Sequence, residues 1–346
     1  MMLAALLVLG VYRAPEFLCG GDVSEIAQVE RAGGVYRYKG KVEDPFQIMK
    51  DAGWNWVRFR IWNNPKDGEC NKEYTLALAK RAVAHGLKFS LDFHYSDWWA
   101  DPGKQYVPAA WKGMGLDDLS KALYDYTKDV VSAMVKQGTV PNMVQIGNEI
   151  LSGMCWPVGQ LKGEDETQWS NLATLLKSGI QAVHDAEGHH HIQTMIHLDR
   201  GGDNKGARWW FDHIGKYNVG FDLIGLSYYT YWHGPLAGLQ PNVQDLAQRY
   251  HKPVYVVETA YPWTDGNRQP RLEPGFTATP EGQAAFVSKV RELIRDAGTG
   301  MPTGLLYWAP TWIPSPKFPS GWGVNATFDY DGNALPAVDA LSAKMK

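Results

Sequence analysis

The sequence is poor in cysteine. Its 346 residues include three, Cys19, Cys70 and Cys155, so at most one disulfide can form within the chain. None of the three forms a metal-type cluster with another, and a fold built on a disulfide framework is excluded. We expect free thiols at all three positions.

The chain also lacks a basic block and a long apolar run. The net charge is −3, so neither nucleic acid nor an anionic membrane surface is expected as a partner. Residues 1–11 are apolar, but a run of roughly ten residues is too short to span a bilayer. This start is similar to the apolar region of a signal peptide. We interpret residues 1–16 as an N-terminal extension that is the remnant of an export signal, and expect a secreted or periplasmic protein. We interpret Leu18-Cys19 as strand residues rather than as a lipoprotein anchor.

Neither a G-x-G-x-x-G fingerprint nor a phosphate-binding P-loop is present, which disfavours a doubly wound sheet. What the chain does contain is a regular alternation of strand and helix patterns. The expected strands are residues 17–21, 56–61, 88–93, 143–147, 192–198, 221–227, 253–258 and 304–308. The expected helices are residues 25–32, 45–52, 75–85, 116–137, 167–186, 208–214, 243–250, 280–296 and 336–344. Eight such units predict an α/β fold, a single-domain (β/α)₈ TIM barrel over residues 17–346.

Two of the expected strands end in a carboxylate. Glu149 follows the apolar run at 143–146, and Glu258 follows the run at 253–257. A carboxylate is costly to place beside a core unless it is paired or functional. Either glutamate alone could serve only as the ion-pair partner of Arg58 or Arg60, but two at equivalent places favour the acid pair of a glycosidase.

Polar and aromatic residues stand at the ends of most other strands. Because the carboxyl ends of the strands meet at one rim of a barrel, we expect these residues to share a site. They are Arg58, Arg60, Asp92, His94, Asn148, His197, Asp199, Ser227, Tyr228, Tyr229, Tyr307 and Trp308. The two arginines have an alternative role in bracing the barrel interior, and the histidines can orient neighbours rather than contact substrate.

The sequence is rich in aromatic residues, with fifteen Trp and seventeen Tyr. Many stand in the long stretches that follow strands, where flat rings with a polar edge suit the apolar faces of a neutral sugar. The tract at residues 189–191 is three histidines, but it has no carboxylate at ligand spacing, so we interpret it as a solvated connection and expect no metal there.

Glycoside cleavage needs two carboxyl groups in different protonation states. One donates a proton to the glycosidic oxygen, while the other is ionised and attacks the anomeric carbon. A separation of roughly 5–5.5 Å between them gives retention, and roughly 6.5–9.5 Å gives inversion. We expect the retaining arrangement, with Asn148 on the 2-hydroxyl group and Trp308 under the reacting sugar.

From residue 20 onward, the chain resembles glycoside hydrolase family 53, the endo-β-1,4-galactanases. Its Asn148-Glu149 strand end is shared with a whole clan of retaining barrels, and the segment after the third strand is more specific to the family. The motifs that carry the resemblance are Gly20-Gly21-Asp22-Val23-Ser24, Val57-Arg58-Phe59-Arg60-Ile61-Trp62, Phe93-His94-Tyr95-Ser96-Asp97, Trp99-Ala100-Asp101-Pro102, Ile146-Gly147-Asn148-Glu149, His197-Leu198-Asp199, Gly225-Leu226-Ser227-Tyr228-Tyr229 and Val257-Glu258-Thr259.

The resemblance implies endo-hydrolysis of β-1,4-galactan, the type I arabinogalactan side chain of pectin, by a monomeric enzyme without a cofactor. It implies Glu149 as acid/base and Glu258 as nucleophile. The implied substrate contacts are Arg58, His94, Asp97, Trp99, Asn148, His197, Asp199, Tyr228, Tyr229, Trp308 and Trp312. Two departures stand out. Ala309 replaces the usual glutamate after the last strand, and residues 264–268 keep only a fragment of the calcium loop found in bacterial members, so no metal is assigned.

Two alternatives remain at this stage. Another retaining endo-glycanase of the same clan would act on mannan, xylan or glucan, because loop aromatics and not the catalytic pair select the polymer. A non-catalytic sugar-binding barrel is disfavoured, since Glu149, Glu258 and Asn148 are all present.

Overall fold

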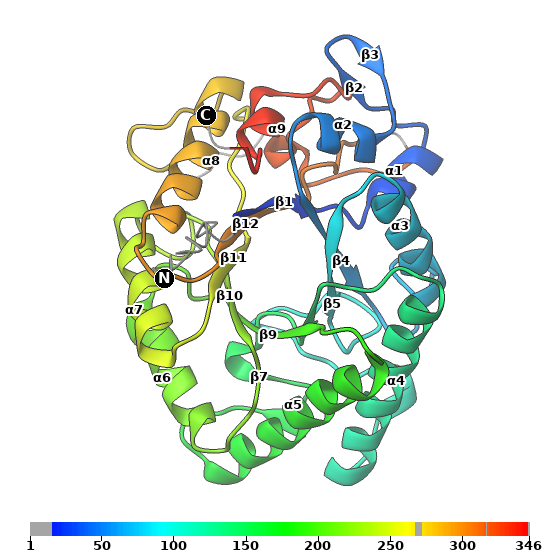
Figure 1. Ribbon diagram of the computed structural model, residues 1–346, viewed down its shortest axis with the longest axis vertical. Coiled ribbons are helices and arrows are strands. Elements are labelled where there is room, and N and C mark those ends of the chain that lie inside the picture. Colours follow the sequence, from blue (N-terminus) through cyan, green and yellow to red (C-terminus); the bar gives the residue numbers. More distant parts are fainter. Residues whose placement is uncertain (1–15, 267–271, 316, 345–346) are drawn as a thin grey trace, which may run out of the picture.

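The structure is a computed structural model that describes residues 16–266, 272–315 and 317–344. It confirms the (β/α)₈ barrel. Figure 1 looks along the barrel, with the strands in a central ring and the helices around them. The interpretation of residues 1–16 as an export remnant lies almost wholly outside the described residues. The calcium-loop fragment is described only as far as residue 266.

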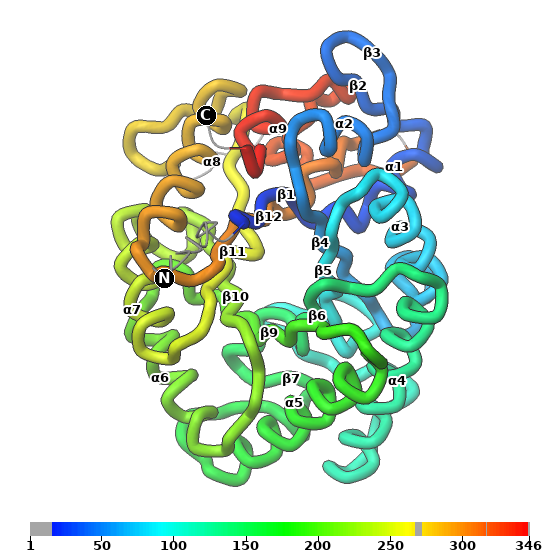
Figure 2. Tube along the Cα trace, viewed as in Figure 1, coloured from blue at the N-terminus to red at the C-terminus, as the bar shows by residue number. Residues whose placement is uncertain are grey.

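Within the described residues, eight parallel strands close the barrel in the order β1-β12-β11-β10-β9-β6-β5-β4. Their bounds are β1 (Leu18–Asp22), β4 (Trp56–Ile61), β5 (Lys88–Phe93), β6 (Met143–Ile146), β9 (Gln193–Leu198), β10 (Leu223–Ser227), β11 (Val254–Glu258) and β12 (Gly304–Trp308). The first and last strands pair in register from Leu18 with Gly304 to Asp22 with Trp308. Figure 2 shows this closure as the blue β1 beside the orange β12. Each strand begins and ends within two residues of its expected position.

The helices pack around the outside of the barrel. They are α1 (Ile26–Arg31), α2 (Pro45–Asp51), α3 (Lys72–Ala84), α4 (Leu116–Lys136), α5 (Glu166–Ala186), α6 (Asn204–Gly215), α7 (Leu239–Tyr250), α8 (Pro280–Arg295) and α9 (Pro336–Ala340). Side-chain caps fix several starts. Asp44 accepts a hydrogen bond from the Phe46 amide at α2, and Thr279 accepts one from the Gly282 amide at α8. Proline at the first position pre-sets the backbone of both helices.

Four helix bounds differ from expectation by three or more residues. Helices α3, α6 and α7 begin three to four residues early, because Asn71 and Asp203 cap α3 and α6, and the first turns carry no strong apolar pattern. The final helix stops at Ala340, not Lys344, because the Ala343 amide turns to the Gly53 carbonyl. Two short hairpins were not expected, and they are β2 (Arg37–Tyr38) with β3 (Lys41–Val42), and β7 (Gly153–Met154) with β8 (Gly159–Gln160). Four 3₁₀ turns among the described residues were also not expected, η1 (Ala109–Trp111), η2 (Ile150–Ser152), η3 (Leu236–Gly238) and η4 (Gly323–Asn325).

The barrel interior has an apolar end and a polar end. Toward the strand starts, large side chains form a buried cluster of Leu18, Trp56, Met143, Met195, Leu223, Tyr255, Val257 and Leu306. Toward the strand ends, inward positions on the same strands are charged or polar. Arg58 follows Trp56 by two residues on β4, and Asp22 follows Leu18 by four on β1, so both keep the inward direction.

All three cysteines lie among the described residues as buried free thiols, which confirms the expectation from their number. Burial raises the pKa of the Cys155 thiol to about 12, so it stays protonated at neutral pH. The barrel is therefore held by packing and hydrogen bonds without a cross-link.

Gly20 pairs with Trp56 where β1 packs against β4. A Cβ atom there would lie 1.8 Å from the Trp56 carbonyl oxygen, whereas one at Gly215 would meet nothing within 4 Å. We therefore expect Gly20→Ala to lower the free energy of unfolding by about 3 kcal/mol, because the strands must separate. Gly215→Ala should leave it unchanged or raise it by up to about 1 kcal/mol. Urea unfolding measures both, and equal stabilities would contradict this account of β1.

Candidate active site

The strand ends and the loops beyond them enclose a pocket of about 460 Å³. Glu149 and Glu258, which end two different strand units, both line it. The other lining residues are His94, Trp99, Ala100, Asp101, Pro102, Lys104, Asn148, Asp199, Tyr229, Trp232, His233, Trp308 and Trp322. Active sites of (β/α)₈ barrels lie at this end, so the pocket is the candidate active site.

The floor of the pocket rests on Arg58, which projects inward from β4 and is 1% exposed. Its guanidinium nitrogens contact Asp22 at 3.2 Å, Asp92 at 2.8 Å, Glu258 at 2.9 Å, Gln145 at 3.1 Å and Asn148 at 3.0 Å. A buried charge costs several kcal/mol unless ion pairs and hydrogen bonds compensate for it. These contacts compensate for the charge and fix the guanidinium in one position.

Glu258 is held at both carboxylate oxygens. One accepts from Arg58 at 2.9 Å, and the other accepts from the Tyr229 hydroxyl at 3.0 Å. The pKa of Glu258 is raised by burial, and also by the negative charges of Asp92 and Asp22, while the positive charge of Arg58 and the Tyr229 hydrogen bond oppose that rise. Arg58 and Tyr229 thus fix the orientation of the carboxylate and limit the rise in its pKa.

Glu149 has different surroundings. Burial raises its pKa well above the ordinary value, and the negative charge of Glu258 raises it further. Arg58 lowers it only weakly by comparison. Burial and the neighbouring carboxylate therefore favour the protonated form of Glu149, whereas the contact with Arg58 counteracts this effect at Glu258.

The backbone that presents Glu149 is unusual. Gly147 has φ +84° and Glu149 itself has φ +49°, a left-handed conformation that is uncommon outside glycine. A Cβ at Gly147 would lie 2.7 Å from the Ile150 side chain. The chain thus turns sharply after β6 and directs Glu149 into the pocket, which is the kind of local strain that clusters at functional sites.

Asn148 is fixed in orientation by its neighbours. Its amide nitrogen donates to the Ala100 carbonyl at 2.9 Å, and its side-chain oxygen accepts from Arg58 at 3.0 Å. With the oxygen occupied, its remaining N–H is the group available to a ligand in the pocket.

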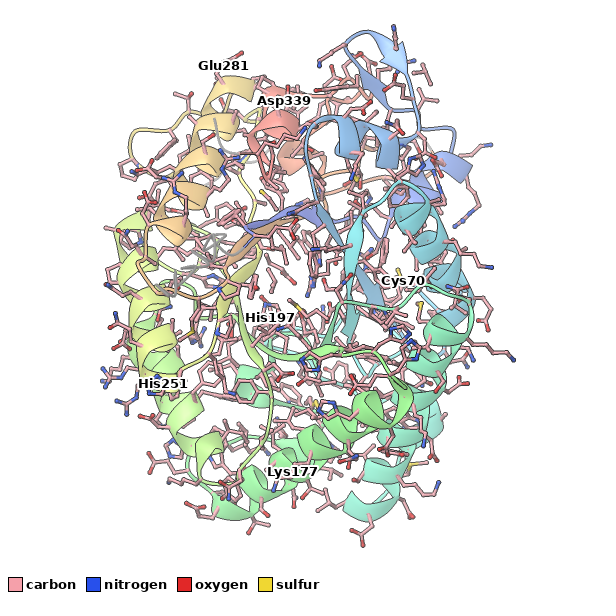
Figure 3. All side chains as sticks on the ribbon, viewed as in Figure 1. Cys70, Lys177, His197, His251, Glu281 and Asp339 are labelled. Atoms are coloured by element: carbon pink, nitrogen blue, oxygen red, sulfur yellow. The ribbon has the colours of Figure 1, made fainter. Side chains whose placement is uncertain are left out.

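Two histidines lie at or just behind the inner wall of the pocket, each with defined hydrogen-bond partners. His94 accepts from the Ala100 amide at Nδ1 and contacts Asp92 at Nε2, 3.1 Å away. His197 contacts Ser227 at 2.9 Å, and burial lowers its pKa well below the ordinary value, so its ring is neutral. Figure 3 shows His197 inside the ring of strands. It lies behind the pocket wall, as an orienter of polar neighbours.

Aromatic rings form much of the outer wall. Trp99 and Trp308 have ring centroids 5.8 Å apart, and Trp322 meets Trp308 edge-on at 4.7 Å. Trp232 is 65% exposed at the mouth. Exposed indole faces of this kind contact the apolar faces of sugar rings.

Five of the expected substrate contacts do not line the pocket. Asp97 accepts from the backbone amides of Asn64 and Ala109, so its carboxylate holds two loops together. Tyr228 is buried and donates to the Gly234 carbonyl at 3.1 Å, away from Glu258. Trp312 stands behind the wall, stacked on Trp99 at 6.3 Å. Arg58 and His197 also lie beneath the surface, but they touch residues that line it.

Several residues of the site were not among the expected catalytic and substrate-binding residues. They are Asp22, Gln145, Asp101, Lys104, Gln105, Trp232, His233 and Trp322. Asp22 ends β1 as Glu258 ends β11, so the strand-end rule was sufficient to find it. Trp232 and Trp322 stand in long loops, and their approach to the pocket depends on the fold.

In the part of the chain that the structure describes, no group of three or more His, Cys, Asp or Glu side chains could hold a metal ion. The rings of His189 and His190 have centroids 3.9 Å apart and are tilted by 38°, on the connection that leads into the start of β9. No helix among the described residues is long and apolar enough to cross a membrane.

The sequence and the structure of the chain were both compared with those of known proteins, and both comparisons identify its family. The model of Glycosyl hydrolase family 53 matches residues 18–341. A relative from Cellvibrio japonicus (strain Ueda107), named arabinogalactan endo-beta-1,4-galactanase, is 38% identical over 365 residues, covering 97% of this chain and 93% of that protein.

Two solved structures are similar over nearly the whole chain. One is from a study of two fungal beta-1,4-galactanases, with a TM-score of 0.86, 34% identity, and coverage of 95% of this chain and 99% of that one. The other is the GH53 catalytic domain of Ignisphaera aggregans, also with a TM-score of 0.86 and 34% identity, covering 97% of this chain and 99% of that one. The chain therefore belongs to glycosyl hydrolase family 53 and is a glycoside hydrolase.

Proposed function

We propose that this enzyme cleaves β-1,4-galactosidic bonds within galactan and type I arabinogalactan, with retention of anomeric configuration. One observation carries the mechanism. Glu149 and Glu258 line the same pocket in unequal surroundings, with a guanidinium 2.9 Å from Glu258 and burial raising the pKa of Glu149. That inequality is what an acid and a nucleophile require.

In the first step, ionised Glu258 attacks the anomeric carbon while Glu149 gives its proton to the departing glycosidic oxygen. The Tyr229 hydroxyl and Arg58 hold the attacking carboxylate in place. In the second step, Glu149 takes a proton from water, and the hydroxide equivalent cleaves the glycosyl–Glu258 ester. Glu149 then ends the cycle protonated, and Glu258 ends it free.

Asn148 supplies the remaining contact to the reacting sugar. Its free N–H is directed to the 2-hydroxyl group, where a hydrogen bond strengthens as positive charge develops on the ring. Trp308 provides a flat face beside this sugar, and Trp99 lies next to Trp308 on the pocket wall.

The choice of galactan is supported by the family and by the names of relatives that cover this chain end to end. The monomeric state implied by the family resemblance is kept as part of this proposal. Galactan is a polysaccharide located outside the cytoplasm. We therefore propose that the protein acts in the periplasm or outside the cell.

Incubation with galactan, mannan, xylan and cellulose separates the substrate alternatives. We expect new reducing ends from galactan alone, in internal-cleavage products, with the β-anomer appearing first in proton NMR. Release from another polymer but not from galactan would overturn the substrate. First appearance of the α-anomer would overturn retention.

Replacement of either glutamate by glutamine should nearly abolish turnover. We expect Glu149→Gln to lower kcat by about 10²–10⁴-fold, the range for loss of a general acid. For Glu258→Gln we expect no detectable glycosyl-enzyme. Glu30→Gln is the matched control, because Glu30 pairs with Arg81 far from the pocket. Steady-state kinetics measure all three, and normal turnover by Glu258→Gln would contradict its role as nucleophile.

The pH profile of kcat/KM should be bell-shaped. Activity falls at low pH as Glu258 gains a proton, and at high pH as Glu149 loses one. Because the pKa of Glu149 is raised, the alkaline limb should lie well above the ordinary range of a glutamate. With an aryl glycoside, whose leaving group needs no proton, Glu149→Gln should lose that limb. An unchanged alkaline limb in the variant would assign it to another group.

A further inference from the structure

Arg60 is a buried cation outside the proposed catalytic set. It follows Arg58 by two residues on β4 and therefore also points into the barrel. It is 2% exposed and does not line the pocket. Its guanidinium carbon lies 4.3 Å from the ring centroid of Trp99 and 5.6 Å from that of Trp62. Arg60 thus covers one face of a ring that does line the pocket.

Two carboxylates also contact the Arg60 guanidinium. Asp22 is 3.2 Å from its terminal nitrogen, and Glu25 is 3.7 Å away. Thr311 fixes Glu25 by donating to its other oxygen at 2.6 Å. The Nε–H of Arg60 is buried without a hydrogen-bond partner among the described residues. Aromatic contact therefore accounts for much of what surrounds this guanidinium.

Trp99 has several ring neighbours. They are Trp62 at 5.1 Å, Trp98 at 6.4 Å, His94 at 6.1 Å, Trp308 at 5.8 Å and Trp312 at 6.3 Å. Contacts between aromatic rings alone would let the Trp99 ring slide against its neighbours. A fixed cation against the ring face adds a directional attraction. With one face covered, Trp99 can offer only the remainder of its surface to the pocket.

We propose that Arg60 is a positioning residue that fixes Trp99 as a platform for a sugar ring beside the one being cleaved. The identity of that sugar rests on the proposed function. Arg60 acts on substrate binding, while Arg58 acts on the nucleophile. Asp22 serves both, with one carboxylate oxygen on each arginine.

A double-mutant cycle between Arg60 and Trp99 tests this. Arg60→Lys keeps the charge but loses the planar face that stacks on the ring. We expect it to raise KM for 1,4-β-galactan by about 3- to 10-fold, the size of one cation–aromatic contact, with kcat nearly unchanged. Trp99→Ala should raise KM at least as much. The two changes together should raise KM little more than Trp99→Ala alone, because each removes the same platform.

Arg81→Lys is the matched control. Arg81 is also paired with two carboxylates, Glu30 and Asp44, and lies 5.1 Å from the Phe46 ring, but it is on α3 away from the pocket. It should change thermal stability and leave KM and kcat as they are. A similar rise in KM for this variant would show that Arg60 acts only through general stability, which would overturn the proposal.

Two further results would overturn it. In the first, the rise in KM of the double variant equals the product of the rises caused by Arg60→Lys and Trp99→Ala alone. That result would show that Arg60 does not act through Trp99. A fall in kcat with unchanged KM would place its action on Arg58 and Glu258 through Asp22. If Arg60→Lys does not fold, Arg60→Met with Glu25→Gln removes the cation and one buried anion together, and the same coupling with Trp99 is expected.

The double-mutant cycle between Arg60 and Trp99 still tests the proposal if galactan is not the substrate. The KM values are then measured on the polymer, whether mannan, xylan or cellulose, that the unaltered enzyme cleaves. Coupling on that polymer would support the role of Arg60 while the galactan assignment fails. Absence of coupling on a polymer that is cleaved would overturn the role of Arg60 while hydrolysis stands.

Discussion

The polar end of this barrel depends on the buried guanidinium of Arg58. It contacts carboxylates from β1, β5 and β11 and amides from the end of β6, so it joins strands that are far apart in the sequence. Removing one partner of such a buried pair costs on the order of 3–5 kcal/mol, because the remaining charges are left uncompensated. The ion pair between Arg58 and Glu258 therefore has two effects. It compensates for buried charge in the barrel interior, and it orients the Glu258 carboxylate.

The two ends of the barrel interior differ in character. Apolar packing dominates at the strand starts, and the charged and polar side chains of the site lie at the strand ends. The apolar cluster that includes Trp56 and Tyr255 fills the interior at the strand starts. At the strand ends, buried carboxylates outnumber buried cations around Arg58 and Arg60. Burial is the main cause that raises the pKa of Glu25 to about 7 and that of Glu149 well above its usual value, and the neighbouring carboxylates raise both further. The proposed proton donor thus depends on the same burial that the barrel imposes on its polar end.

Much of this was readable from the sequence, because strand ends in a closed barrel converge. Glu149 and Glu258 follow apolar runs of similar length, and both line the pocket. Tyr228 shows the limit of that rule. It is adjacent to Tyr229, and neighbours on extended backbone point to opposite sides, so only one of the two can face Glu258. Loop residues such as Asp97 and Trp232 carry no periodic signal, and their positions depend on contacts with distant segments.

The shared use of Asp22 has an evolutionary consequence. One oxygen holds the arginine under Trp99, and the other holds the arginine beside Glu258. A substitution at this position is expected to disturb Arg58 and Arg60 at once. A change in the preferred glycan is therefore expected to arise more easily at an outer-loop residue such as Trp232, which is exposed at the mouth of the pocket.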